Sequence, residues 1–299
     1  MANDLSNYTV EIMANEGLLI LEENMVMGNL VHRDWAEEVK KKGSTIDINR
    51  PGTFTAADKV DGNVVPQDLD SDQVQIVMNQ EKDVTFAVTD VEHTQAFKNM
   101  IDEYMRPGMI AIADNIDSAL TALYVNLTTE INVTSPSSVA HSDITAVNKA
   151  MNAAKVPKTQ RRFVVGTEAE DDLLNIDNYL TVDKTGGTQA LQDAALGRKV
   201  GFDFYMDQNI VSTGASPATE HNMAFHRNAF ALAMRPLEVA HNPAKMGVDM
   251  KVVNYNNLGI RVSLGYSFLA KKTLCSLEVL YGVKTLDANL GVELNLQYS

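Results

Sequence analysis

The sequence has little of what disulfide-stabilised, membrane-spanning and secreted proteins depend on. It contains one cysteine, Cys275, which excludes an intrachain disulfide and favours synthesis in a reducing cytoplasm. It has no run of roughly 18 consecutive apolar residues, so we expect no membrane-spanning helix and no membrane partner. Its first residues lack both a basic flank and an apolar run, so we expect no secretory signal.

Basic residues are also scarce. The 25 Lys and Arg residues are outnumbered by 39 Asp and Glu residues, which gives a net charge of −14. Because binding to nucleic-acid backbones depends on Lys and Arg replacing counterions, this balance argues against tight DNA binding over a broad surface. It does not exclude a local basic patch. The densest basic run, residues 40–42, is better explained as a complement to a helix dipole.

The motifs of phosphate-binding and nucleophilic chemistry are absent. There is no Gly-x-x-x-x-Gly-Lys-Ser/Thr loop and no Gly-x-Ser-x-Gly elbow. The six histidines form no His-x-x-x-His pair, and we interpret His226 as a strand-edge residue rather than a base. With a single cysteine, zinc sites built from thiolates are excluded. We therefore predict no catalytic residue, no cofactor and no metal site.

One acidic segment partly matches a calcium-binding loop. Asp68, Asp70 and Asp72 match the first three ligand positions of an EF-hand. The glycine required at the sixth position is replaced by Gln73, and the closing glutamate is replaced by Asn79. These departures favour a solvated acidic tip, and cation binding stays open as the alternative.

The residues that are present suffice for a sizeable core. Apolar residues make up 45% of the 299 residues, and this length predicts two packed lobes or one elaborated domain. Near the N-terminus, the spacing of apolar residues predicts helices over 8–27 and 29–41. Gly28 is expected to separate the two helices, and Gly43 is expected to end the second.

From Gly43 to Glu92 the apolar period changes to two. Apolar residues alternate over 46–48 and again over 74–78 and 84–88, while the segment 51–72 between them is rich in turn residues. The pattern predicts a long two-stranded arm with a polar tip. An isolated two-stranded ribbon is marginally stable, so the arm must lie on a neighbouring subunit or on its own body. If it lies on a neighbour, the candidate contacts in the arm are Arg50, Phe54, Lys59, Val64 and Val65.

Residues 94–127 carry the strongest helical pattern. Apolar residues recur at steps of three and four, and Pro107 predicts a break or kink after which a second half begins. Asp114 and Asp117 are expected to point away from the apolar stripe. The candidate core residues of this helix are Ile116, Leu120 and Leu123.

The rest of the chain mixes short helices with strands. Ser142 is expected to cap a helix through Ala154, and Thr167 with Glu170 forms a predicted capping box. Strands are predicted over 163–165, 200–206, 230–234, 260–266 and 275–283. The chain is therefore expected to be an α+β protein.

Three segments of the C-terminal half resemble recurring segments of tailed-bacteriophage coat proteins. The first is a Gly-Arg entry followed by a strand around Gly-Phe-Asp, the second is an aromatic residue and Arg before Ala-Phe-Ala, and the third is a closing strand and tail. In this sequence they are residues 196–206, residues 225–233, and residues 279–284 with Gly291-Val292.

Together with the order of the N-terminal elements, these segments resemble the Hong Kong 97-type capsid fold along essentially the whole chain. The resemblance implies an N-terminal helical arm, a long β-hairpin extended loop, a spine helix, and axial and peripheral domains. The corresponding divisions are 1–42 (arm), 43–92 (extended loop), 93–160 (spine helix and peripheral domain), 161–225 (axial domain) and 226–299 (peripheral strands returning to the axial domain, and tail). Only residues 212–222 follow the Gly-Phe-Asp strand where some short-tailed-phage coat proteins carry an inserted domain, so the chain is similar to the branch without it.

The resemblance implies a structural function rather than an enzyme. A major capsid protein self-assembles as pentamers and hexamers into an icosahedral shell around double-stranded DNA, without sequence-specific binding. It implies a scaffolding protein and a portal as partners, assembly in the host cytoplasm, and residence in the virion. An encapsulin-like cellular nanocompartment shares the fold and stays open as the alternative. An enzyme is a third option, for which the sequence offers no converging set of titratable residues.

Overall fold

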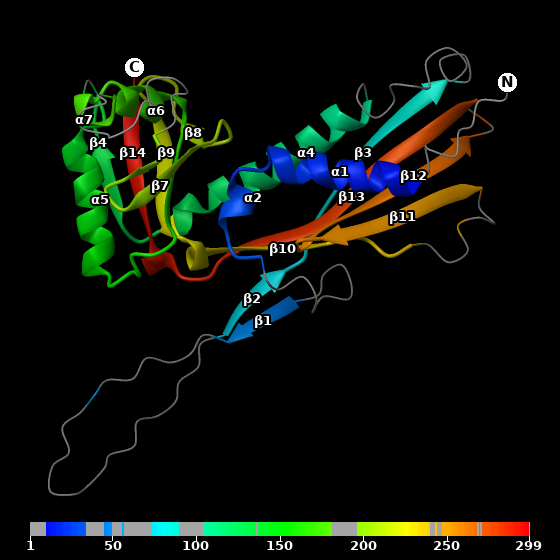
Figure 1. Cartoon of the computed structure of the whole chain (residues 1–299), viewed down its shortest axis with the longest axis horizontal. Helices are drawn as coiled ribbons and strands as arrows, with labels where there is room; N and C mark the ends of the chain where they lie inside the picture. Colours follow the sequence, from blue (N-terminus) through cyan, green and yellow to red (C-terminus); the bar gives the residue numbers. More distant parts are fainter. Residues whose placement is uncertain are drawn as a thin grey trace, which may run out of the picture.

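The computed structural model describes residues 10–33, 45–49, 56, 73–89, 104–135, 137–180, 196–239, 243, 247–267, 269 and 271–298. Two lobes lie end to end, each built on its own β-sheet, and a short ribbon of two strands leaves near their junction (Figure 1). The α+β class predicted from the sequence is confirmed.

The first lobe is an elongated five-stranded antiparallel sheet with two helices on one face (Figure 1). Its strands are β3 (Gln80–Thr89), β10 (Phe230–Arg235), β11 (Val248–Tyr255), β12 (Leu258–Ser267) and β13 (Lys272–Thr285), and its helices are α1 (Val10–Asn24) and α4 (Arg106–Thr121). Alternate residues of β13 face the helices and form the larger core with them: Cys275, Leu277, Val279 and Tyr281. This alternation is the period-two pattern read from the sequence.

The second lobe is a mixed seven-stranded sheet. In spatial order its strands are β4 (Glu130–Val133), β14 (Gly291–Tyr298), β9 (Ala218–His226), β5 (Arg161–Val165), β7 (Phe202–Met206) and β6 (Arg198–Lys199), with β8 (Ser212–Thr213) beside β9. The helices α5 (His141–Ala153), α6 (Thr167–Leu174) and α7 (Asp177–Leu180) lie with it. A second core packs Ile144, Val147 and Met151 of α5 against Phe163 and Leu294 of the sheet.

Two chain segments cross from one sheet to the other. The strand β9 passes through the 3-10 turn η5 (Arg227–Ala229) into β10, and β13 passes through η7 (Ala288–Leu290) into β14. At the first crossing Phe225 and Phe230 pack edge to face with ring centroids 5.2 Å apart, and His226 accepts a hydrogen bond from Asn228 N–H. The predicted strand over 230–234 is confirmed as β10, and the turn η5 separates it from β9 where the chain changes sheets.

The N-terminal helices differ from the prediction. The helix α1 ends at Asn24, and the short α2 (Met27–Leu30) contains Gly28 rather than beginning after it. Val31 is extended and His32 bridges to Ala231, so the second predicted helix was wrong over the described residues 31–33; residues 34–41 lie outside the described part of the chain.

The cause of the early break lies in α4. The Asp117 carboxylate accepts hydrogen bonds from Val26 N–H and Gly28 N–H, which fixes the turn between α1 and α2. Asp114 is exposed as predicted, but Asp117 is only 1% exposed, so its predicted orientation away from the core was wrong.

The base of the predicted arm is present. The strands β1 (Thr45–Asn49) and β2 (Gln73–Val77) pair antiparallel, with Thr45 opposite Val77. The return leg was expected to continue through residue 88. Instead, β3 pairs with β13 over residues 80–89 and belongs to the first lobe. An alternating pattern reports that a strand has two different faces and does not report its partner.

The spine helix begins as expected and ends early. Pro107 lies in the first turn of α4, and residues 94–103 lie outside the described part of the chain. Ile116 and Leu120 are fully buried, whereas Leu123 is partly buried in the 3-10 helix η4 (Ala122–Asn126). The predicted α-helix through residue 127 therefore stops at Thr121.

The start of α5 also differs in detail. Ser142 lies inside the helix, and Asp143 Oδ2 accepts the hydrogen bond from Ala140 N–H at 2.9 Å. The N–H of Ala140, the residue just before the helix, is thus bonded by the side chain of Asp143, whereas Ser142 was the predicted cap.

Burial of Leu120 makes the first prediction. Leu120→Asp should yield insoluble or misfolded protein, because lesions of this size in a core cost about 2–5 kcal/mol and an unpaired buried carboxylate adds to that cost. The control is Ala111→Asp, at an exposed position of the same helix, which should stay soluble with a wild-type melting temperature. Soluble Leu120→Asp protein with the wild-type melting temperature would contradict the buried placement.

Candidate functional site

The predicted arm contacts cannot be placed. Arg50, Phe54, Lys59, Val64 and Val65 all lie outside the described residues. The same holds for the acidic segment Asp68, Asp70 and Asp72. What the structure does describe is the base from which this part of the chain leaves.

The base of the arm is fixed to the outer face of the first sheet, opposite the helices. Ile46, Ile48, Ile76 and Met78 form a small separate core with three residues of the sheet, Ala231, Ala233 and Leu280. Gly282 of β13 permits the close approach, since a Cβ atom there would lie 2.4 Å from the carbonyl oxygen of Val77. The base of the ribbon is therefore held in one position on the sheet.

Next to this base, the outer face carries a chain of polar contacts across three strands. The guanidinium of Arg261 forms an ion pair with Glu278, and its Nη1 donates to the carbonyl of Glu238 at 2.7 Å. Ser276 Oγ donates to Glu278 Oε1 at 3.1 Å, and Thr85 Oγ1 donates to Ser276 Oγ at 3.0 Å. Such cross-strand pairs stabilise the sheet while leaving its outer face polar.

An open groove of about 620 Å³ lies between the end of β10 and β11. Its apolar part includes Val239, which is 43% exposed. Seven residues line it: Arg235, Pro236, Leu237, Glu238, Val239, Val252 and Asn254. The charged groups of the described lining are the carboxylate of Glu238 and the guanidinium of Arg235.

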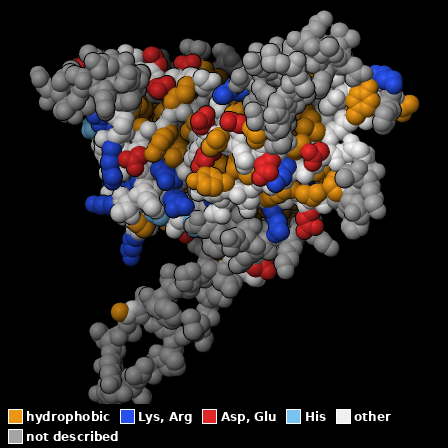
Figure 2. All heavy atoms as spheres, turned by 45° about the vertical axis from the view of Figure 1, so that its right-hand side comes forward, with side chains coloured by type: hydrophobic (Ala, Val, Ile, Leu, Met, Phe, Trp, Pro, Cys, Tyr) orange, Lys and Arg blue, Asp and Glu red, His pale blue; other side chains and the backbone are white. Residues whose placement is uncertain are grey.

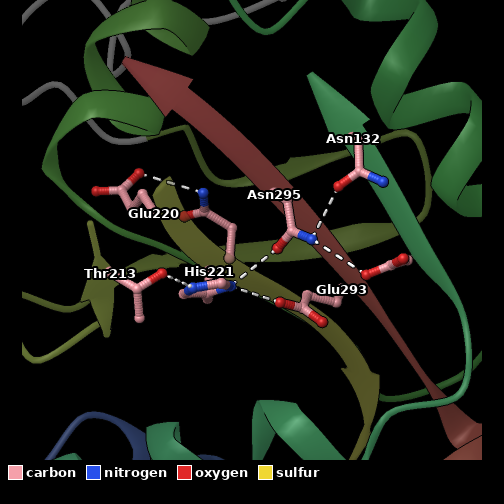
Figure 3. Close-up of polar contacts among 8 residues, drawn as sticks. Asn132, Thr213, Glu220, His221, Glu293 and Asn295 are labelled. Carbon is pink, nitrogen blue, oxygen red and sulfur yellow. Dashed lines mark hydrogen bonds and ion pairs between the residues drawn. The ribbon is translucent and has the colours of Figure 1, made fainter. Parts of the chain in front are cut away.

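The second sheet carries a polar network on the face opposite its helices (Figure 3). The Nδ1 atom of His221 lies 2.7 Å from Glu293 Oε1 and 3.0 Å from Asn295 Oδ1, and its Nε2 atom lies 2.7 Å from Thr213 Oγ1. The ring of Tyr124, from the end of the spine helix, stacks on the imidazole with centroids 4.0 Å apart. The network thus joins the spine to the second sheet.

Thr213, His221 and Glu293 form a line of hydroxyl, imidazole and carboxylate, which is the order found in acyl-transfer enzymes. Catalysis also needs a position for the reacting carbonyl next to the hydroxyl and donors for its oxyanion. Here Tyr124 covers the imidazole, Asn295 shares its Nδ1 atom, and the groove lies in the other lobe. Burial raises the pKa of Glu293, an effect opposed by its hydrogen bond to His221. We interpret the line as packing between strands.

One feature of the sequence indicates this network: polar residues inside two otherwise apolar strands. Polar residues alternate with apolar residues along β14 at Glu293 and Asn295, and Glu220, His221 and Asn222 lie together in β9. Polar residues inside strands that are otherwise buried predict hydrogen-bonded partners on neighbouring strands.

The start of α6 is capped from a distant strand. Glu220, which is 3% exposed, accepts hydrogen bonds from Glu168 N–H and Ala169 N–H, and Asn222 Oδ1 accepts one from Gly166 N–H. Thr167 is the first helical residue and supplies no cap, so the predicted capping box was wrong. A Cβ atom at Gly166 would collide with the Glu220 carboxylate, which leaves no room for the local cap.

A small basic group lies between the lobes. Burial lowers the pKa of Arg162, and Arg227 and Arg33 add to this effect by repulsion, while Asp203 opposes it. Figure 2 shows apolar, acidic and basic side chains interspersed over the face drawn.

Cys275 cannot take part in a disulfide between folded subunits. Its side chain is buried in the first core, and burial raises the pKa of its thiol to about 12. Since the thiolate is the reactive form, the thiol is inert at neutral pH.

Among the described residues, no three His, Cys, Asp or Glu side chains are grouped so that they could hold a metal ion. No helix in this part of the chain has the length and apolar character that a membrane crossing requires.

The cap on α6 makes the second prediction. Glu220→Ala should lower the free energy of unfolding by about 1–3 kcal/mol, because it leaves buried N–H donors without an acceptor. The control is Glu168→Ala, at an exposed position of the same first turn, which should change stability by less than about 0.5 kcal/mol. Urea denaturation measures both, and equal midpoints for the two variants would rule out the cap.

Comparison with known proteins gives a fold without close sequence relatives. No family model matches the sequence, and no curated protein is similar to it. A solved structure from Mycobacterium phage Che8 aligns with a TM-score of 0.66 and 21% identity over 90% of each chain. The capsid structure of the cyanophage P-SCSP1u aligns at 0.62 and 13% identity, covering 92% of this chain and 89% of that one. A virus-like particle from Pyrococcus furiosus aligns at 0.54 and 9% identity, covering 95% of this chain and 98% of that one.

These alignments extend over both lobes and the elements between them. The order of helical arm, ribbon, spine helix and two sheets is the order that the sequence resemblance implied. The chain therefore has the Hong Kong 97-like capsid fold.

Proposed function

We propose that this chain is the major capsid protein of a tailed bacteriophage, a subunit that assembles into an icosahedral shell around double-stranded DNA. The observation that carries the proposal is the similarity to phage structures along nearly the full length of both chains, including a phage capsid. Pentamers and hexamers, a scaffolding protein, a portal and a place in the virion are part of the same proposal. It includes no catalytic activity and no cofactor.

The physical features of the molecule agree with this function. The ribbon of β1 and β2 is anchored on the face of the first sheet opposite the helices, and in the proposed shell this ribbon contacts a neighbouring subunit (Figure 1). Contacts of this kind are heterologous, and they close into rings when the rotation between subunits closes. The net charge of −14 suits a wall that encloses a polyanion without adhering to it.

The proposed division of the chain follows the resemblance with one change. Residues 1–42 form the arm, 93–160 the spine and part of the peripheral domain, 161–225 the axial domain, and 226–299 the returning strands and tail. The extended loop, first set at 43–92, is better taken to end before β3, because β3 pairs with β13 in the first lobe. Membership of the branch without an inserted domain also stays a proposal.

A cellular nanocompartment is the second candidate. It is favoured by the alignment with the virus-like particle from Pyrococcus furiosus, which covers most of both chains. The two candidates differ in what purified shells contain: DNA-packaging partners in one case and an enzyme cargo in the other.

Self-assembly is the third prediction. Concentrated protein, alone or with a co-expressed scaffold, should form rings, shells or tubes under negative-stain microscopy, with a matching fast species in sedimentation. Protein that stays monomeric in all of these preparations would exclude both candidates.

The arm makes the fourth prediction. Replacing residues 53–71 with Asn-Gly should leave a folded subunit, because β1 and β2 can still pair through a short connection made of residues 50–52, Asn-Gly and residue 72. Shells should fail to form or should be aberrant, since the removed residues are the proposed contact with a neighbour. In the intact protein, trypsin should cut after Lys59 in free subunits and leave that bond uncut in particles.

The control for the arm is the other short hairpin. Asn257→Gly alters the turn between β11 and β12, where φ is +60° and glycine is well tolerated, and it should leave assembly unchanged. Normal shells from the arm variant, or equal cleavage after Lys59 in both states, would mean that the arm packs on its own subunit.

A further inference from the structure

Three segments that are distant in sequence meet at one buried point. They are the turn between α1 and α2, the middle of the spine helix α4, and the loop that follows β7. Asp117 of α4 accepts hydrogen bonds from Val26 N–H at 2.6 Å and from Gly28 N–H at 2.8 Å. One carboxylate thus holds the N-terminal helices on the spine.

The loop after β7 brings a second carboxylate to the same place. Asp207 is 2% exposed, and its Oδ1 atom accepts a hydrogen bond from Asn209 N–H at 2.8 Å. Its Oδ2 atom is buried and has no hydrogen-bond partner among the described residues. The loop is tied to the spine helix through Thr121, whose Oγ1 donates to the carbonyl of Asn209 at 2.9 Å.

The charged groups around this pair are themselves acidic. Burial raises the pKa of Asp117 to about 7, with repulsion from Asp207 as the second cause and the N–H donors of the α1–α2 turn opposing both. Burial also raises the pKa of Asp207, opposed by its hydrogen bonds with Asn209, while Asp114 of α4 raises it further. On the β13 side of α4, the Tyr281 hydroxyl donates to Asn115 Oδ1 at 2.7 Å and so is already engaged.

A buried acceptor without a donor is costly unless a proton supplies one. A proton on either carboxyl removes the repulsion between the two, and a proton on Asp207 also removes the charge from its unpartnered buried carboxylate. We propose that Asp117 and Asp207 form a proton-dependent latch, which holds the N-terminal helices and the second lobe on the spine helix and loosens when both carboxyls ionise.

The sign of the effect follows from linkage. In an opened junction both carboxyls are solvated and titrate near 4, whereas in the closed junction the pKa of Asp117 is about 7. Between pH 4 and pH 7 the closed junction therefore holds a proton that the opened junction has released. Opening should become more frequent by about tenfold for each pH unit through this window, and it should level off above it.

The latch would set how firmly the two lobes are held together. The loop after β7 belongs to the second sheet, and α4 belongs to the first lobe, so opening at this point loosens contacts between lobes. The remaining links are the covalent crossings after α4, β9 and β13, with contacts such as the stacking of Tyr124 on His221 and the hydrogen bond from Leu286 N–H to the carbonyl of Ala229 at 2.7 Å. A subunit below the window is rigid, and one above it has a looser junction.

Amide hydrogen exchange of the full-length unassembled protein tests the proposal. After correction for the intrinsic exchange rate, peptides covering residues 25–30 and 207–211 should lose protection by about tenfold per pH unit between pH 5 and 7. Peptides from the middle of β9 and β14 should not. The double variant Asp117→Asn/Asp207→Asn should lose this dependence, because neither asparagine titrates, and Asp207→Asn alone should weaken it by removing the repulsion on Asp117.

The matched control is Asp171→Asn, an exposed aspartate of α6, which should keep the wild-type dependence. The proposal is overturned if the wild-type peptides show no dependence on pH, or if the dependence persists in the double variant. The measurement needs no assembled particle. A failure of the latch and a failure of shell assembly are therefore separate results.

Discussion

The whole structure depends on the pairing of one strand, β13. Along one edge its residues 272–281 pair with β3, and along the other edge residues 272–278 pair with β12 and residues 280–285 with β10, so most of the strand is paired on both sides. Its two faces serve different partners. Cys275 and Leu277 face α1 and α4, while Leu280 on the opposite face packs under the base of the arm, where Gly282 allows close contact. From its end the chain continues into the second sheet.

Around this strand the molecule has two lobes, and the junction between them contains titratable side chains. Each sheet is covered by helices on one face, and the core of the first lobe extends to Val164 and Met223 of the second sheet. Between them lie polar contacts: Tyr124 on His221, Thr121 with the Asn209 carbonyl, and Asp117 with the turn after α1. Polar contacts between packed lobes are more sensitive to pH than apolar ones, because burial changes the proton affinity of their groups.

Some groups in the second lobe resemble catalytic residues but have contacts that stabilise the fold. His221, Glu293 and Thr213 have the distances of an acyl-transfer triad, but the imidazole is covered and shared. Glu220 is buried like a catalytic acid, yet both of its oxygens accept hydrogen bonds at the start of α6. In each case the contacts described for these side chains lie within the fold.

Periodicity along the sequence was sufficient for the class and order of the elements. It predicted the start of the spine at Pro107, the burial of Ile116 and Leu120, and the pairing of residues 45–49 with 73–77, because these depend on which face of a local segment is apolar. Only the tertiary structure decided the partner of β3, the burial of Asp117 and the cap on α6. Each of these depends on a group distant in the chain: Asp117 binds N–H groups 89 and 91 residues away, and Glu220 reaches across 51 residues to Ala169. A pattern within one segment reports the need for a partner, and folding of the whole chain determines which group meets it.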